Sequence, residues 1–262
     1  MKIRFPKRSG QRYWAPHFEF LVGVLEGGGW GLDYRVRGDA VLGCGIGDRE
    51  VLFEYSDLGR ILWGEVPCDV HFKFHCWGGI RDRVLPFSPV SFHDWGLYER
   101  MAKEISYTCN SGRVLNRQRI FGNARGRRRK VQKILKESVF SSVHNFSSPS
   151  VFWKDMVDCL VSVCVPGQRE DILDRGQLQY MGLGCCTVSP KLKIVLAYDQ
   201  AVVPGVHYVE CAPDYADLVE VLHWCKAHQK ECVDIGQNAK ELFIRCCTPK
   251  KLVEWIEQCV LQ

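Results

Sequence analysis

The sequence has 262 residues, enough for one large domain or two smaller ones, with 46% hydrophobic, 11% aromatic and 25% charged side chains. This composition is typical of globular proteins and excludes disordered, collagen-like and coiled-coil classes. No apolar run reaches the roughly 18 residues of a membrane helix, and no apolar segment follows the basic residues 1–8 as in a signal peptide. We therefore expect a cytoplasmic protein with no membrane partner.

The 14 cysteines predict buried thiols, because a chain of this size forms a core without disulfide bonds. No Cys-x-x-Cys pair occurs, and the pairs Cys185-Cys186 and Cys246-Cys247 are adjacent. Structural zinc usually needs the spaced arrangement. The sequence therefore predicts no metal site.

The formal net charge of +5 comes from one segment. Residues 113–136 hold ten basic side chains and no acidic one, so the other 25 basic residues face all 30 acidic ones. Such a concentration of charge predicts a bound polyanion, either a diphosphate or a nucleic-acid backbone, although a solvated helix face is an equal alternative. The ten residues are Arg113, Arg117, Arg119, Arg125, Arg127, Arg128, Arg129, Lys130, Lys133 and Lys136.

In chain order, the first strands are predicted at 51–55 and 70–75 from their alternating and aromatic residues. The glycines of 43–47 suggest a cofactor-binding fingerprint, but the third glycine is not at the required spacing, so a hairpin is the better interpretation. The turn cluster 110–112 predicts a boundary between an acceptor-side lobe, 1–112, and a donor-binding lobe, 113–262.

From residue 113 onward, predicted strands alternate with predicted helices. This alternation predicts an α/β protein with a parallel sheet and helices on both faces. The last helix, around Trp255, is expected to return to the first lobe. The predicted strands are 114–121, 160–165, 186–189 and 207–211, and the predicted helices are 127–137, 150–158, 174–183, 215–228, 232–245 and 250–260.

Ligands of open α/β sheets bind beyond the carboxyl ends of the strands. Three segments are expected there, 122–125, 166–169 and 171–184. An arginine at this edge binds phosphate through two hydrogen bonds, and a carboxylate accepts a hydrogen bond from a sugar hydroxyl. The pair Asp174-Arg175 fits this chemistry, and it equally fits a helix cap followed by a surface arginine. No Gly-x-Ser-x-Gly, P-loop, His-Glu-x-x-His or Asp-x-Asp motif is present.

The stretch Asp171 to Pro190, followed by His207-Tyr208-Val209 and Asp214 to Leu218, resembles the donor-binding half of GT-B glycosyltransferases. It looks most like the capsule-associated and protein O-glucosyltransferase family and small viral or bacterial relatives. The shared features are an arginine at a helix entry, a small-residue strand ending in proline, and His-Tyr ahead of an Asp-x-Ala-Asp-Leu segment. The resemblance covers about residues 114–245, and the first half of this much shorter chain matches poorly.

This resemblance implies a GT-B fold, two Rossmann-like lobes with a cleft between them, and metal-independent transfer from a nucleotide-diphosphate sugar, with a UDP-sugar favoured. The donor is a co-substrate, and no other cofactor is implied. The resemblance assigns the diphosphate to Arg175 and to Arg125 or Arg128, and the ribose or sugar to Asp174 or Gln177. The turn 182–184 would let the main chain approach the donor. Gly167 and Arg169 complete the expected donor-binding residues.

An inverting transfer needs a base for the acceptor hydroxyl, and in this architecture the base comes from the first lobe. Asp57, which follows a predicted strand, is the first choice, although it equally fits a turn cap. His75 is the second choice, although a histidine between Phe74 and Cys76 is more often a core residue than a base, and His17 and Asp94 are reserves. Without a metal, arginines and helix N-termini must neutralise the leaving diphosphate.

The acceptor is expected to be a glycan, a small metabolite or a hydroxymethylated pyrimidine in duplex DNA, the last in the manner of small phage enzymes acting in an infected bacterial host. Arg127, Arg129 and Lys130 would then contact the acceptor or nucleic acid, and Trp77 would support a flipped base. For Trp77, Trp95 and Tyr98 a position in the protein core is the better interpretation. The alternative function is a non-catalytic nucleic-acid-binding protein that uses segment 113–136.

Overall fold

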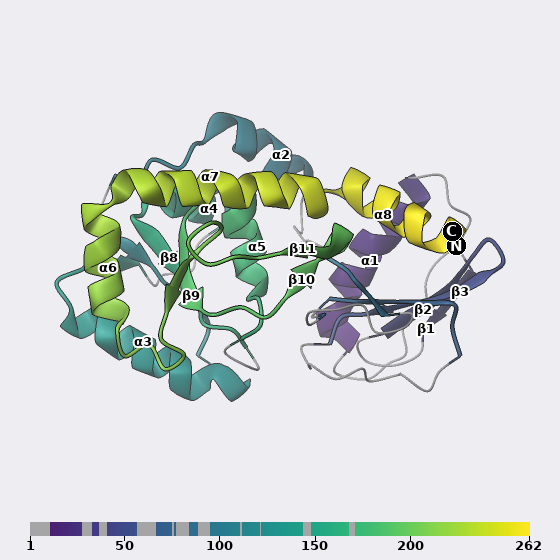
Figure 1. Cartoon of the computed structure of the whole chain (residues 1–262), viewed down its shortest axis with the longest axis horizontal. Helices are drawn as coiled ribbons and strands as arrows, with labels where there is room; N and C mark the ends of the chain where they lie inside the picture. The colour runs from purple at the N-terminus through teal and green to yellow at the C-terminus, as the bar shows by residue number, and fades with distance from the viewer. Residues whose placement is uncertain are drawn as a thin grey trace. The chain divides into compact units, whose positions relative to one another are not determined.

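The computed structural model describes two compact units of mixed α/β structure (Figure 1). Unit 1 comprises Met1–His93, Ile194–Ala201 and Arg245–Gln262, and unit 2 comprises Asp94–Lys193 and Val202–Ile244. The predicted α/β class is confirmed. The residues that the structure describes are 11–27, 33–36, 41–56, 67–74, 76, 84–88, 95–110, 112–120, 122–143, 148–167 and 171–262.

The division into units differs from the expected boundary at residue 112. Helix α2 (Trp95–Glu104) belongs to unit 2, because its Tyr98 is buried there against Trp153 and Phe243 and donates a hydrogen bond to Gly182 O at 2.7 Å. The turn at 110–112 therefore lies inside unit 2. The tyrosine supports the core interpretation of the aromatic residues in this segment.

Unit 1 contains a five-stranded mixed sheet in the order β1-β2-β3-β4-β5. Strands β1 to β3 are antiparallel neighbours, whereas β3, β4 and β5 are parallel. Gly47 occupies the turn between β2 and β3 at φ +62°, a conformation that favours glycine, so the hairpin prediction is confirmed. The elements are α1 (Gln11–Gly27), β1 (Asp33–Val36), β2 (Val41–Ile46), β3 (Arg49–Glu54), β4 (Val70–Lys73) and β5 (Val84–Pro86).

Two later segments complete unit 1. The first holds β10 (Val195–Leu196), a 3-10 turn η2 (Ala197–Asp199) and β11 (Gln200–Ala201), and the second holds helix α8 (Pro249–Leu261). Trp255 Nε1 donates to Pro86 O at 2.9 Å, and Tyr198 OH donates to Lys251 O at 2.7 Å. The expectation that the last helix returns to the first lobe is confirmed.

Unit 2 is built on a fully parallel sheet in the order β12-β9-β8-β6-β7, as the alternation of elements predicts. The predicted strand 114–121 is limited to two residues, because the polar residues after Leu115 bond across to the loop that follows β8. Helix α3 contacts α6 (Figure 1). The elements are β6 (Val114–Leu115), η1 (Gly122–Ala124), α3 (Arg125–Glu137), β7 (Ser142–Val143), α4 (Pro149–Asp158), β8 (Val161–Val163), α5 (Arg175–Gly182), β9 (Thr187–Pro190), β12 (Val209–Cys211), α6 (Leu218–Ala227) and α7 (Gln229–Cys246).

All 14 cysteines are free thiols, and only Cys68 and Cys259 are not fully buried, so the prediction of buried thiols is confirmed. Burial raises the pKa of Cys44 to about 12, because a thiolate would lose its hydration. Within the described part of the chain, no group of three or more metal-ligating side chains comes together. Among the helices that the structure describes, none has the length and apolarity of a membrane span.

Candidate functional site

Gln118, which follows β6, forms hydrogen bonds that connect the loops at the carboxyl edge of the parallel sheet in unit 2. Its side-chain amide donates to Val165 O at 3.1 Å and to Asp174 Oδ2 at 2.7 Å, and its carbonyl accepts from Val165 N at 2.7 Å. These bonds join the loops that follow β6 and β8 to the start of α5. The bonds of Gln118 therefore fix the main chain at Val165 and hold the start of α5 against the loop after β6.

Arg128 is part of the same network and is buried. Its guanidinium donates from Nε and Nη2 to Val165 O at 3.3 and 3.2 Å and from Nη1 to Arg119 O at 2.6 Å, and Nη2 lies 3.5 Å from Asp174 Oδ2. A diphosphate would have to replace these bonds. The structure therefore favours Arg125 over Arg128 for the expected phosphate contact, because Arg125 is exposed.

Asp174 caps α5, which confirms the helix-cap interpretation of this residue. Its Oδ1 accepts from Gly176 N at 2.8 Å, while Oδ2 faces Gln118 and Arg128. Both carboxylate oxygens are thus engaged within the protein. A contact with a ribose or sugar stays a prediction, and it would compete with these bonds.

Replacing Asp174 by alanine is expected to lower the free energy of unfolding by about 2 to 3 kcal/mol. The change removes the helix cap and leaves the buried Gln118 amide and Arg128 guanidinium with fewer acceptors. Urea unfolding followed by circular dichroism measures it. Asp214→Ala is the matched control, because that carboxylate is exposed, and its midpoint should stay nearly unchanged. Equal midpoints for the two variants would contradict the role assigned to Asp174.

Gln177 lies beneath this edge rather than on it. Its side chain is fully buried and donates from Nε2 to Thr187 Oγ1 at 3.0 Å and to Ser189 Oγ at 3.3 Å. These bonds fasten α5 to β9. A donor would reach Gln177 only after the edge opened, so its expected contact with a ribose or sugar has no support in the geometry.

The expected approach of the turn 182–184 to a donor is wrong. Gly182 lies at the far end of α5, where a Cβ would be 3.0 Å from Tyr98 Oη and 3.2 Å from the Phe243 ring. Gly184, at φ +75°, lies against Gly236 of α7. The small residues of this turn therefore allow close packing of helices, which sequence alone does not distinguish from close approach to a ligand.

The open part of the carboxyl edge is the start of α3. Gly122 adopts φ +61°, and Ala124 precedes the helix without a side-chain cap. Arg125 and Arg129 are exposed and form no ion pair with a described residue. Uncapped amide groups and unpaired guanidinium groups at a helix N-terminus favour a bound anion.

The remaining basic residues of this segment are more constrained. Arg127 is half-buried and donates from Nη2 to Pro166 O at 3.0 Å, next to the half-buried Gly167. Lys130 Nζ donates to Asp214 Oδ2 at 2.9 Å, and this bond holds the pKa of Asp214 below its usual range. The roles expected for Arg127, Lys130 and Gly167 in binding stay predictions.

Several expected site residues lie outside the described residues. They are Asp57, His75, Trp77, Asp94 and Arg169. For Arg175 and His17 the structure describes the main chain, in α5 and α1, but not the side chain. Their proposed roles stay predictions.

Unit 1 contains a buried polar cluster that the sequence analysis missed, formed by Glu54, Ser56, His71 and Lys73. All four side chains are at most 4% exposed. Lys73 Nζ lies 2.6 Å from Glu54 Oε1 and 2.9 Å from Ser56 Oγ, His71 Nε2 lies 3.1 Å from Glu54 Oε2, and Ser56 Oγ donates to Glu54 Oε1. The cluster joins the carboxyl end of β3 to β4, where Glu54 and Lys73 are register partners.

The charges of this cluster depend on one another. Burial by itself raises the pKa of Glu54, but hydrogen bonds from His71, Lys73 and Ser56 and the charge of Lys73 outweigh burial and hold the pKa below its ordinary value. The sequence carried a signal for this polar cluster, because Glu54 and Lys73 interrupt apolar runs. Their strands, β3 and β4, each have a neighbouring strand on both sides. Strands of this kind are buried on both faces, so a charged residue there needs an internal partner.

Comparisons with known proteins leave the family open. No known family model matches the chain. Two curated viral proteins are similar over short stretches: uncharacterized protein 179R of Invertebrate iridescent virus 6 is 24% identical over 89 residues, 31% of this chain, and uncharacterized protein 035R of Invertebrate iridescent virus 3 is 35% identical over 46 residues, 18% of this chain. The matches span only 8% and 4% of those proteins' lengths.

Similarity to solved structures extends over a larger part of the chain. The sucrose-phosphate synthase of Thermosynechococcus elongatus aligns with 69% of this chain and 52% of its own, at 14% sequence identity and a TM-score of 0.43.

Proposed function

We propose that the chain is a metal-independent glycosyltransferase of GT-B type that transfers a sugar from a nucleotide-diphosphate sugar, with a UDP-sugar favoured, to a hydroxyl acceptor. The observation that carries the proposal is the open start of α3 at the carboxyl edge of a parallel sheet. There Gly122 is left-handed, the helix is uncapped, and Arg125 and Arg129 are exposed. A diphosphate matches this arrangement of amide and guanidinium donors.

The chemistry of transfer divides between donor and acceptor. As the bond from the sugar to the diphosphate breaks, negative charge grows on the leaving oxygen, and Arg125, Arg129 and the first amides of α3 would stabilise it without a metal. The acceptor hydroxyl loses its proton to a base, for which we propose Asp57. This residue directly follows Ser56 in the chain, and the hydrogen bonds of Ser56 with Glu54 and Lys73 fix the preceding residue.

The proposed acceptor is a glycan, a small metabolite or a hydroxymethylated pyrimidine in duplex DNA. For DNA, Arg127 and Lys130 would contact phosphates beside the donor. This choice of acceptor extends the proposal and is tested separately, by transfer of radiolabelled sugar to modified and unmodified duplexes.

The donor proposal predicts a selective thermal shift. A nucleoside diphosphate or its sugar, at about 100 times its dissociation constant, should stabilise the protein by about 2.7 kcal/mol, which raises the melting temperature by about 5 °C or more. The panel contains uridine, guanosine, adenosine and cytidine diphosphates and their sugars, with and without magnesium. Arg125→Ala/Arg129→Ala and Arg175→Ala should abolish the shift, and Lys136→Ala, on the exposed last turn of α3, should keep it. No shift with any nucleotide would overturn the proposal.

The alternative is a nucleic-acid-binding protein without catalysis, and the geometry disfavours it. Arg113 pairs with Asp158 at 2.6 Å, Arg117 pairs with Asp155, and Lys130 pairs with Asp214, so carboxylates of the same protein already neutralise part of the basic segment. Binding to a nucleic-acid backbone would be indifferent to the nucleotide and would fall steeply with salt. Such behaviour, without a nucleotide-specific shift, would favour this alternative.

A further inference from the structure

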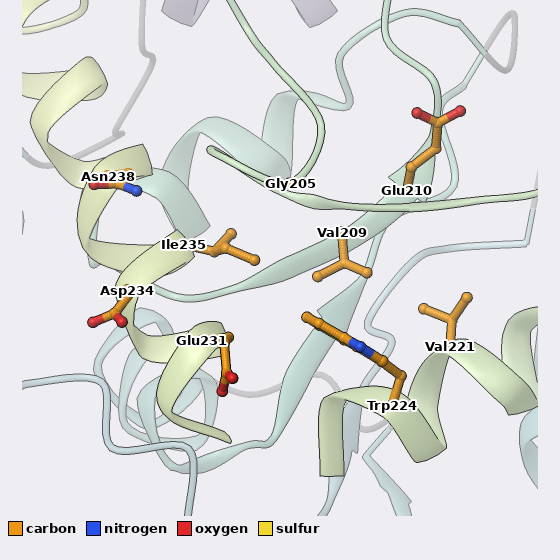
Figure 2. A pocket seen from close by; sticks show the side chains of 9 residues that line it. All are labelled: Gly205, Val209, Glu210, Val221, Trp224, Glu231, Asp234, Ile235 and Asn238. Carbon is orange, nitrogen blue, oxygen red and sulfur yellow. The ribbon is translucent and has the colours of Figure 1, made fainter. Parts of the chain in front are cut away.

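A pocket of about 510 Å³ lies between β12, α6 and α7 of unit 2 (Figure 2). Its walls include Gly205, which precedes β12, and Trp224, in the second half of α6. Because α6 follows β12 and returns along it, these residues lie toward the amino end of the strand. The pocket is therefore distinct from the carboxyl edge at which we propose the donor site, and its volume is in the range of small-molecule sites.

The floor of the pocket is apolar and carries an exposed indole. Val209 and Ile235 line it, and Figure 2 shows the Trp224 indole extending from α6 toward Val209. Trp224 is 39% exposed, although tryptophan is among the more buried residues on average. His228 stacks on one face of the ring at a centroid distance of 4.6 Å and an interplanar angle of 13°. This contact holds the indole in position and leaves its opposite face as a flat apolar platform.

The polar groups available beside this platform come from α7. Glu210 of β12 is not one of them, because successive residues of a strand point to opposite faces and its carboxylate is directed away from Val209 and the indole (Figure 2). Glu231 and Asn238 lie two helical turns apart on one face of α7, about 10 Å along its axis. Both side chains are exposed and form no hydrogen bond or ion pair with a described residue.

The charge of the lining restricts the kind of ligand. Among the described residues that line the pocket, three are acidic and none is basic, so a phosphate or another anion would be repelled. A polycation is also disfavoured, because Asp234 is paired with Lys230 at 2.8 Å and Glu231 alone supplies one charge. A neutral ligand that has an apolar face and a hydroxyl-bearing edge matches the indole platform and the polar wall of α7.

We propose that this pocket binds a neutral glycan, with one pyranose ring of β-linked glucose stacked on Trp224. In this sugar the hydroxyl groups are equatorial and the ring hydrogens are axial, so both faces of the ring are apolar. The slightly positive axial hydrogens are attracted to the negative face of the indole. Glu231 would accept a hydrogen bond from a hydroxyl at the ring edge, and Asn238, two turns further along α7, would reach the next sugar of the chain. Glycan binding here is additional to the proposed transfer and does not depend on the donor site.

The test is saturation-transfer difference NMR of the full chain titrated with cellotetraose, a neutral β-linked tetramer of glucose. Trp224→Leu should weaken binding about ten-fold, because the flat face is lost while an apolar side chain remains, and Trp224→Phe should weaken it less. Glu231→Ala/Asn238→Ala should weaken binding about five-fold through the loss of two exposed hydrogen bonds. Glu241→Ala is the matched control, an exposed carboxylate of α7 outside the pocket, and its affinity should be unchanged.

Two further ligands test the chemistry of recognition. The β-linked tetramer of glucuronic acid keeps the rings but carries a carboxylate on each, and it should bind at least ten-fold more weakly than cellotetraose. Cyclohexanol covers apolar surface but has a single hydroxyl, and it should also bind at least ten-fold more weakly.

Equal affinity for either compound would overturn the proposal, as would an unchanged cellotetraose affinity in Trp224→Leu or no binding of cellotetraose to the native protein. The melting temperatures of the variants should match that of the native protein, because the substituted side chains are exposed. None of these results bears on the nucleotide-specific thermal shift, which tests the donor site separately.

Discussion

Replacing Lys73 by methionine is expected to lower the free energy of unfolding of unit 1 by about 3 to 5 kcal/mol. The variant leaves the Glu54 carboxylate fully buried without the ammonium group that lies 2.6 Å away. An uncompensated buried charge of this kind is among the most destabilising changes a core tolerates. Urea unfolding monitored by tryptophan fluorescence and circular dichroism measures the loss.

The double variant Glu54→Leu/Lys73→Met is the control for this prediction. It removes both charges and should recover much of the lost stability, because the desolvation penalty disappears together with the ion pair. Similar midpoints for the single and the double variant would show that Lys73 acts through its packing rather than its charge.

The pH dependence of the same pair gives an independent readout. The pKa of Glu54 is lower in the folded protein than in the unfolded chain. The ionised carboxylate therefore stabilises the fold at pH values above the unfolded-state pKa, and this stabilisation is lost as the pH falls through the folded-state pKa. The difference in stability between the native protein and Lys73→Met should therefore shrink on acidification below about pH 4. A constant difference across this range would contradict the charge assignment.

Gly236→Ala is expected to lower the free energy of unfolding of unit 2 by about 3 kcal/mol or more, because the added methyl group has no room. A Cβ at this position would lie 2.1 Å from Gly184 O, 3.0 Å from Gly184 C and 3.1 Å from Cys186 N. All three atoms belong to the main chain at the turn between α5 and β9, so no side chain can rotate away. Helix α7 would have to move off this turn.

Gly126→Ala provides the opposite case in the same unit. Gly126 lies in α3, and a Cβ there would have nothing within 4 Å. Because alanine is the better helix former, the change should stabilise the protein by about 0.5 to 1 kcal/mol. Thermal unfolding of both variants measures the two effects, and destabilisation by Gly126→Ala, or an unchanged midpoint in Gly236→Ala, would contradict this account of the packing.

The sequence predicted unit 2 better than unit 1, and the reason is local. In unit 2, each strand and the helix that follows it come from one continuous stretch of sequence. The alternation of apolar patterns therefore predicts that strands and helices alternate and that the sheet is parallel. In unit 1, by contrast, segments far apart in the sequence join one fold, as the bond from Trp255 to Pro86 shows. A turn-forming cluster such as 110–112 predicts a local boundary, but it does not show that a distant segment returns to the first unit.

The candidate site was predicted in part. The glycine loop and the basic helix were identified because they are adjacent in sequence, and the structure leaves Arg125 exposed at this place. The engagement of Arg128 with Val165 was not foreseeable, since Arg128 lies on α3 and Val165 lies in the loop after β8, 37 positions later. The same holds for Gly236, whose neighbour Gly184 lies 52 positions earlier in the chain.

The interrupted sequence of unit 1 has a consequence for synthesis of the protein. A ribosome releases the sheet of β1 to β5 long before α8, whose Trp255 and Lys251 contact Pro86 and Tyr198. At about 5 to 20 residues per second, the nascent sheet waits roughly 10 to 30 seconds for its last helix. Unit 2 is complete by then, so the unit whose sheet is translated earlier finishes folding later.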